Sequence, residues 1–204
     1  ATYEGRQRAK AMLGYLPQDL GLYPNLNAYE FLDYMAILKG VTDKQQRKQQ
    51  IDDLLEKVRL TDAASRRLKT YSGGMKRRVG IAQALLGDPK LLIVDEPTAG
   101  LDPEERVRFR NLLSDMAQER TIILSSHIVE DISQSCSDLA IMQKGRVIYR
   151  GTPTQLIEQA RGHVWVIKGN GERPSEELTL VSTLQLHDGV QYRVVGNPAG
   201  YDAV

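Results

Sequence analysis

The chain has 204 residues, of which 41% are hydrophobic and 26% charged, enough to bury one substantial core. Its 27 basic and 26 acidic residues give a net charge of +1, so no overall field favours nucleic acid or an anionic membrane surface. The single cysteine, Cys136, excludes an intramolecular disulfide and a cysteine-rich metal site, and no apolar run approaches the roughly 20 residues of a membrane-spanning helix.

The beginning of the chain is predicted to form one short strand followed by helices. The apolar run 11–16 is closed by a proline, which is typical of a strand leaving the core. Asn27 with Glu30 three residues later predicts a capped helix, and Thr42 with Gln45 repeats that pattern. Apolar residues recur at helical spacing after each cap, so both helices are expected to be amphipathic.

Another helix and a strand come next. Ser72 is predicted to cap a third helix, so a helical subdomain is expected over about 19–87. The uninterrupted apolar run 91–94 is typical of a strand that is buried on both faces.

Asp102 marks the clearest helix start in the chain. It is predicted to be the cap, with Pro103 at the first helical position and Glu105 as the reciprocal acceptor of a capping box. Later elements are predicted as a strand at 121–124, a helix at 128–136, a strand pair at 139–142 and 147–149, a helix from 152 and a strand at 163–168.

This order of elements predicts the fold class. Strands alternate with helices, which indicates an α/β core with a largely parallel sheet and a helical subdomain inserted near its start. We expect the main domain over 1–160 and a small C-terminal extension of unknown role over 161–204, where the pattern weakens.

Two adjacent carboxylates, Asp95 and Glu96, follow the buried strand 91–94. In open α/β sheets ligands bind at the carboxyl ends of the strands. One acidic residue there can hold Mg²⁺, and a second can orient and deprotonate a water that attacks a phosphoryl group. For an isolated pair, a solvated loop after a core strand would be the better explanation.

Ser72, Gly73 and Gly74 begin the third helix and suggest an anion site. Two glycines leave backbone N–H groups accessible at the positive end of a helix, and the serine hydroxyl adds a donor. The alternative is an ordinary serine-capped helix.

His127 and Gln18 each follow a predicted strand. His127 is expected at the same sheet edge as Asp95 and Glu96, where it can reach a phosphate or the attacking water. Gln18 offers a neutral amide that can contact a metal ion or water. A lone histidine or a loop glutamine is more often structural.

Together these segments closely resemble the ATP-binding cassette (ABC) family. Segment 14–18 resembles the Q-loop, 71–75 the signature motif, 91–97 the Walker B strand, 99–102 the D-loop and 125–127 the switch-histidine segment. The resemblance spans about 11–160, and it implies a P-loop NTPase-like core that uses ATP and Mg²⁺.

The resemblance also implies a role for each site residue. Glu96 would be the general base that aligns water on the γ-phosphate, and Asp95 would hold Mg²⁺ through water. Gln18 would complete the shell of the metal and the water. His127 would contact the γ-phosphate and stabilise charge in the transition state.

In the family, two such domains form a head-to-tail dimer that holds two nucleotides between them. By resemblance, the signature residues Ser72, Gly73, Gly74 and Met75 would contact the ATP held by the opposite subunit. Asp102 would lie at that dimer interface.

Met75 and the basic run 76–78 resemble a branch of drug, lipid and polysaccharide exporters whose membrane subunits are separate chains. The resemblance implies a transmembrane permease as partner, no nucleic acid, and a cytoplasmic location on the inner face of the membrane. Two alternatives stay open: a soluble ABC ATPase of translation or DNA repair, and a catalytically silent module that completes a partner's site.

The 204 residues contain no Gly-x-x-x-x-Gly-Lys-Ser/Thr phosphate-binding loop, and the chain does not open with methionine. We therefore expect an N-terminally truncated ABC domain that is inactive alone, whose site residues act in a longer protein.

Overall fold

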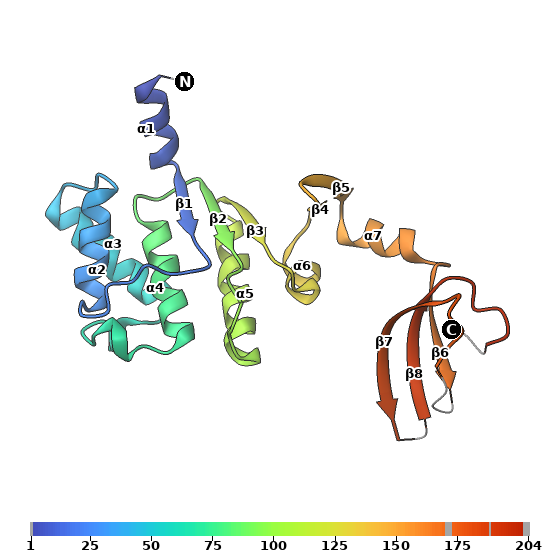
Figure 1. The fold of residues 1–204 in the computed structure, drawn as a ribbon. Helices are drawn as coiled ribbons and strands as arrows, with labels where there is room; N and C mark the ends of the chain where they lie inside the picture. Colours follow the sequence, from blue (N-terminus) through green and yellow to red (C-terminus); the bar gives the residue numbers. More distant parts are fainter. Residues whose placement is uncertain (1, 170–172, 188, 202–204) are drawn as a thin grey trace. The chain divides into compact units, whose positions relative to one another are not determined.

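The computed structural model describes residues 2–169, 173–187 and 189–201 (Figure 1). The chain forms two compact units, Ala1–Ser135 and Cys136–Val204. The domain boundary predicted at residue 160 stays a prediction. No helix within the described ranges is long and apolar enough to cross a membrane.

The N-terminal unit contains a three-stranded parallel sheet of order β1-β2-β3 (Figure 1). Its strands are β1 (Leu13–Leu16), β2 (Leu91–Asp95) and β3 (Thr121–Ser125). The register sets Asp95 beside Ser125, so the strands end together at one edge. The predicted α/β class with a parallel sheet is confirmed, and the ligand-binding edge of such sheets is the one that presents Asp95.

A helix that the sequence analysis missed precedes β1. Helix α1 (Tyr3–Ala11) begins where the Thr2 hydroxyl accepts the Gly5 N–H, 3.2 Å away. The strand predicted from Ala11 therefore begins only at Leu13. The helix has a polar sequence with no apolar stripe, and that is why periodicity did not indicate it.

The helices predicted between residues 19 and 87 are present, and the subdomain bounds stay a prediction. Its elements are α2 (Ala28–Leu38), α3 (Lys44–Lys57), the short 3₁₀ helices η1 (Thr61–Ala63) and η2 (Leu68–Thr70), and α4 (Gly73–Leu85). Asn27 and Glu30 form the predicted capping box. The cap of α3 is Asp43 and not Thr42, because the Asp43 carboxylate accepts the Gln46 N–H at 2.7 Å. A charged acceptor makes the stronger cap.

Helices and strands share one hydrophobic core in this unit. Leu32 of α2, Leu55 of α3 and Ile81 of α4 belong to the same buried cluster as Leu16 and Leu92 of the sheet. Movement of the helical subdomain relative to β1 and β2 would therefore disturb a continuous core.

Helix α4 packs closely on β1 because glycines occupy two of the contact positions. A Cβ at Gly14 would overlap the carbonyl oxygen of Ala84, and one at Gly80 would lie 2.6 Å from side-chain carbons of Leu16 and Leu20. The missing side chains let the helix approach the end of the strand.

Helix α5 (Pro103–Ala117) is capped by Asp102, whose carboxylate accepts the Glu105 N–H at 2.8 Å, as predicted. The predicted reciprocal role of Glu105 is wrong. Its carboxylate lies 3.1 Å from Arg108 and 3.7 Å from Arg78, because two cations attract it more strongly than a backbone amide.

Helix α6 (Val129–Ser135) completes the N-terminal unit. The C-terminal unit contains an antiparallel hairpin, β4 (Leu139–Gln143) and β5 (Arg146–Gly151), followed by α7 (Pro153–Ala160). It ends in an antiparallel sheet of order β6-β8-β7, with β6 (Val164–Gly169), β7 (Thr179–Leu186) and β8 (Gly189–Val195). The Tyr192 and Val194 side chains of the central strand are buried in its small core.

Candidate functional site

Ser125 contacts both Asp95, the predicted Mg²⁺ residue, and Glu96, the predicted general base, at the carboxyl edge of the sheet. Its hydroxyl donates a hydrogen bond to the Asp95 carboxylate. Its carbonyl oxygen accepts the Glu96 N–H at 3.1 Å, and the same N–H lies 3.3 Å from the hydroxyl oxygen. The end of β3 thus fixes the main chain directly after β2.

Glu96 leaves the strand in a left-handed backbone conformation, with φ of 45°. A non-glycine residue rarely adopts this conformation, and it persists only where the surroundings hold it. Because such conformations cluster at functional sites, this one makes Glu96 a candidate functional residue.

His127 and Glu96 are in direct contact. His127 Nδ1 lies 2.7 Å from Glu96 Oε2, and the histidine side chain is 73% exposed while the glutamate is 18% exposed. Oε2 itself is shielded from solvent and has no other hydrogen-bond partner among the described residues. A carboxylate that is partly shielded from solvent and held beside an exposed imidazole is suited to act as a general base toward a bound water.

Arg77 is a buried cation beside this pair that the sequence analysis used only as a mark of the exporter branch. Its guanidinium donates to the carbonyl oxygens of Pro17 and Glu96. Burial lowers the pKa of Arg77, while the charges of Asp19 and Asp95 act in the opposite direction. The sequence showed only that residue 77 is an arginine, and no local pattern predicted these two contacts.

The signature segment lies at the start of α4. The Ser72 hydroxyl caps the helix by accepting the Met75 N–H at 3.2 Å, and both Ser72 and Gly73 are exposed. Gly74 is buried, and a Cβ there would overlap the Glu105 carboxylate. The N-termini of α4 and α5 therefore meet, with Asp102 exposed at the second of them.

The structure joins Asp95, Glu96 and His127 through direct contacts and through Ser125. Gln18 is exposed and directly follows Pro17, whose carbonyl is held by Arg77. The predicted roles of all these residues, and of Ser72, Gly73, Gly74, Met75 and Asp102, stay predictions.

A second network, of one hydrogen bond and one ion pair around Asp131, was not predicted from the sequence. Asp131, on α6, accepts a hydrogen bond from the Thr98 hydroxyl and lies 3.1 Å from Arg110 of α5. It connects the segment between β2 and α5 to the helix that follows His127. Its only sequence signal is an acidic residue four positions after that histidine.

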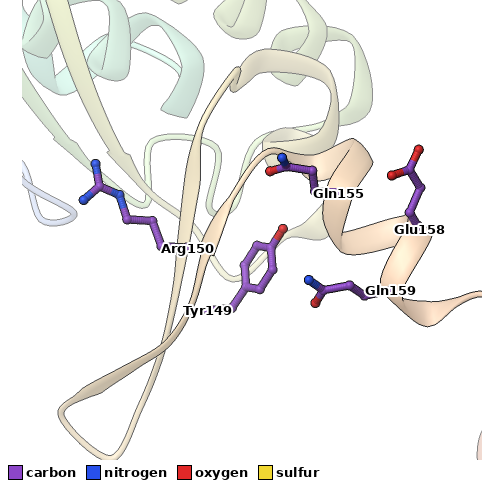
Figure 2. A pocket seen from close by; sticks show the side chains of 5 residues that line it. All are labelled: Tyr149, Arg150, Gln155, Glu158 and Gln159. Carbon is purple, nitrogen blue, oxygen red and sulfur yellow. The ribbon is translucent and has the colours of Figure 1, made fainter.

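Figure 2 shows the side chains that line a pocket between β5 and α7 of the C-terminal unit. Its lining residues are Tyr149, Arg150, Gln155, Glu158 and Gln159. None of the predicted site residues lines it, and Tyr149 and Gln155 serve the local fold by bonding to Thr152.

Known proteins resemble the chain in sequence and in fold. The family described as "ABC transporter" matches residues 1–99. The ABC transporter ATP-binding protein YxlF of Bacillus subtilis is 36% identical over 158 residues, which are 78% of this chain and 53% of YxlF. This chain belongs to the ABC transporter ATP-binding family.

Other members of this family match to a similar extent. The linearmycin resistance ATP-binding protein LnrL of B. subtilis is 37% identical over 76% of this chain and 50% of LnrL. The probable multidrug ABC transporter ATP-binding protein YbhF of Escherichia coli is 35% identical over 88% of this chain and 31% of YbhF. The chain spans about half the length of the first curated relatives it matches.

A solved ABC structure has the same fold. CbiO1 of Clostridium perfringens, part of the ABC transporter complex CbiONQ, matches 78% of this chain and 64% of its own with a TM-score of 0.69 and 28% identity. The family implies ATP binding, and the prediction that the sheet edge around Asp95 faces ATP stays a prediction.

Proposed function

We propose that this chain supplies the hydrolytic part of an ABC ATPase that couples ATP hydrolysis to a permease, with Glu96 as the general base. The contact between Glu96 and His127 at the carboxyl edge of the parallel sheet is the observation that supports this most strongly. A water that lies against the Glu96 carboxylate would lose its proton as it attacks the γ-phosphate, and the His127 imidazole would stabilise the charge that develops there.

The residues at this edge fit Mg²⁺ only together with a nucleotide. Within the described ranges, no group of three or more His, Cys, Asp or Glu side chains is arranged to hold a metal ion. Mg²⁺ is usually held by one or two carboxylates and by substrate phosphates, and it neutralises charge on those phosphates. Asp95, with its orientation set by Ser125, would hold the ion through water, and Gln18 would supply an amide oxygen.

The exposed start of α4 would serve a second nucleotide. Ser72 and Gly73 present a hydroxyl and free backbone N–H groups, which suit the γ-phosphate of ATP bound to another copy of the domain. Gly74 would place α4 close to α5, and Met75 and Asp102 would lie at the same interface.

The relatives support a transport function over the alternatives. LnrL and YbhF are named for linearmycin resistance and as a probable multidrug transporter, so we favour an exporter in which a separate permease is the partner of this chain. The domain would then work on the cytoplasmic face of the membrane. A soluble translation or repair ATPase would have no permease, and a silent module would not need both Glu96 and His127.

The decisive experiment compares three proteins by steady-state ATP hydrolysis. One is this chain, which has no Gly-x-x-x-x-Gly-Lys-Ser/Thr motif. The second is a loop-bearing chimera that adds the strand and phosphate-binding loop of a relative such as LnrL, and the third is the same chimera with Glu96→Gln. We expect turnover only in the second protein. Equal turnover with and without Glu96→Gln would refute the role of Glu96.

Partner capture separates a transporter from a soluble ATPase. We expect the chimera, expressed in its native host, to purify with an integral membrane protein. Recovery with ribosomes or DNA and without any membrane protein would favour the soluble alternative.

A further inference from the structure

We propose that Arg77 is a positioning residue for hydrolysis, because one guanidinium holds the main chain at both Glu96 and Pro17, the residue before Gln18. The inference rests on the proposed role of Glu96 as general base. It goes beyond the motif residues, because Arg77 contacts only main-chain atoms of the site and no reacting group.

The Arg77 guanidinium bridges two main-chain carbonyl oxygens. Arg77 Nη1 donates to the carbonyl oxygen of Pro17 at 2.9 Å, and Nη2 donates to that of Glu96 at 3.2 Å. The residue is 7% exposed, and its two acceptors follow different strands, β1 and β2. A planar guanidinium can fix the spacing of two acceptors in a way that a lysine ammonium cannot.

Glu96 needs such a restraint because its backbone is in the left-handed region. Ser125 holds its N–H, and Arg77 holds its carbonyl oxygen, so the peptide groups on both sides are anchored. Removal of one anchor lets the residue relax toward a more common conformation, which moves the carboxylate away from His127.

Helix α4 places Arg77 within hydrogen-bond distance of both carbonyl oxygens. The helix lies close to β1 because Gly14 and Gly80 have no side chains, and Arg77 is one turn before Gly80. The same helix begins at the signature segment. Phosphate binding at Ser72 and Gly73 is thereby linked through α4 to the position of Glu96.

Arg47 offers a matched control. It is 8% exposed, and its guanidinium also donates to two main-chain carbonyls, those of Val41 and Thr42, but it lies in the helical subdomain next to Asp33. Arg47→Met therefore removes an equally buried guanidinium without touching the sheet edge.

The first measurement is amide hydrogen exchange of Glu96 in this chain, followed by NMR. Removal of a charge-assisted hydrogen bond predicts about 10-fold to 100-fold faster exchange of the Glu96 N–H in Arg77→Met, after correction for global stability. Arg47→Met should leave the corrected rate unchanged. An unchanged rate in Arg77→Met would overturn the proposal, and Arg77→Lys serves as the second variant if Arg77→Met does not fold.

The second measurement is ATP hydrolysis by the loop-bearing chimera. Arg77→Met should lower kcat about 10-fold or more with KM for ATP nearly unchanged, because positioning acts on the transition state. Arg77→Lys should recover part of the loss, and Arg47→Met should change neither constant. A chimera without Glu96-dependent turnover would refute the proposed function, while the exchange data would still decide the role of Arg77.

Discussion

Asp131 is 1% exposed, and its carboxylate is held between the Thr98 hydroxyl and the Arg110 guanidinium, 3.1 Å away. Replacement by asparagine would leave the partly buried Arg110 guanidinium without its counter-charge. We expect Asp131→Asn to lower the free energy of unfolding by about 3 kcal/mol and Thr98→Val by about 1 kcal/mol, both measured by urea denaturation.

The control for this network is Asp138→Asn, because Asp138 is exposed. It should change the free energy of unfolding by less than about 0.5 kcal/mol. If Asp131→Asn is no more destabilising than this control, the buried network does not stabilise the unit.

At the scale of single residues, the sequence predicted which residues would lie at the sheet edge, but it did not predict which residues they would contact. Asp95, Glu96 and His127 could be placed at one sheet edge because each follows an apolar strand. The partners Ser125, Arg77 and Asp131 come from elements far apart in the chain, and their contacts depend on packing that no local pattern encodes.

At the scale of elements, the contact between α4 and β1 depends on the absence of two side chains. Gly14→Ala would push a methyl group into the Ala84 carbonyl, and Gly80→Ala would crowd Leu16 and Leu20. We expect each to destabilise the protein by about 1–3 kcal/mol, the usual cost of overpacking. Thermal unfolding followed by circular dichroism measures this.

Gly21→Ala is the matched control, because a Cβ there meets no atom within 4 Å. It should leave the melting temperature within about 2 °C of the parent protein. Equal melting temperatures for all three variants would show that α4 and β1 are less tightly packed than the structure has them.

Helix starts were the elements best predicted from sequence, because a cap is a local arrangement of three or four residues. Asn27, Ser72 and Asp102 all cap as expected. Asp43, and not the predicted Thr42, is the cap of α3. The pairing of β7 with β8 could not be predicted, because strand pairing is non-local.

At the scale of the whole molecule, β3 is an edge strand of the parallel sheet in the described part of the chain (Figure 1). Ile123 on this strand is 52% exposed. Free edges with apolar side chains promote association between chains, and lysine on an edge opposes it. We expect this chain to self-associate at micromolar concentration and Ile123→Lys to reduce the associated fraction, as measured by light scattering.

The loop-bearing chimera provides the comparison for this prediction. If the added strand pairs with β3, it should be monomeric without nucleotide under the same conditions. Self-association of the chimera equal to that of this chain would show that the β3 edge is not responsible.

The central claim is that Glu96 lies in an ATP site completed by the signature segment of a second copy. It is tested most directly by the molar mass of the Glu96→Gln chimera with and without Mg-ATP, because blocked hydrolysis should trap the nucleotide between two copies. We predict a dimer with Mg-ATP, a monomer without it, and no dimer when Ser72→Arg is added. A Glu96→Gln chimera that binds ATP and remains monomeric at saturating nucleotide would contradict the claim.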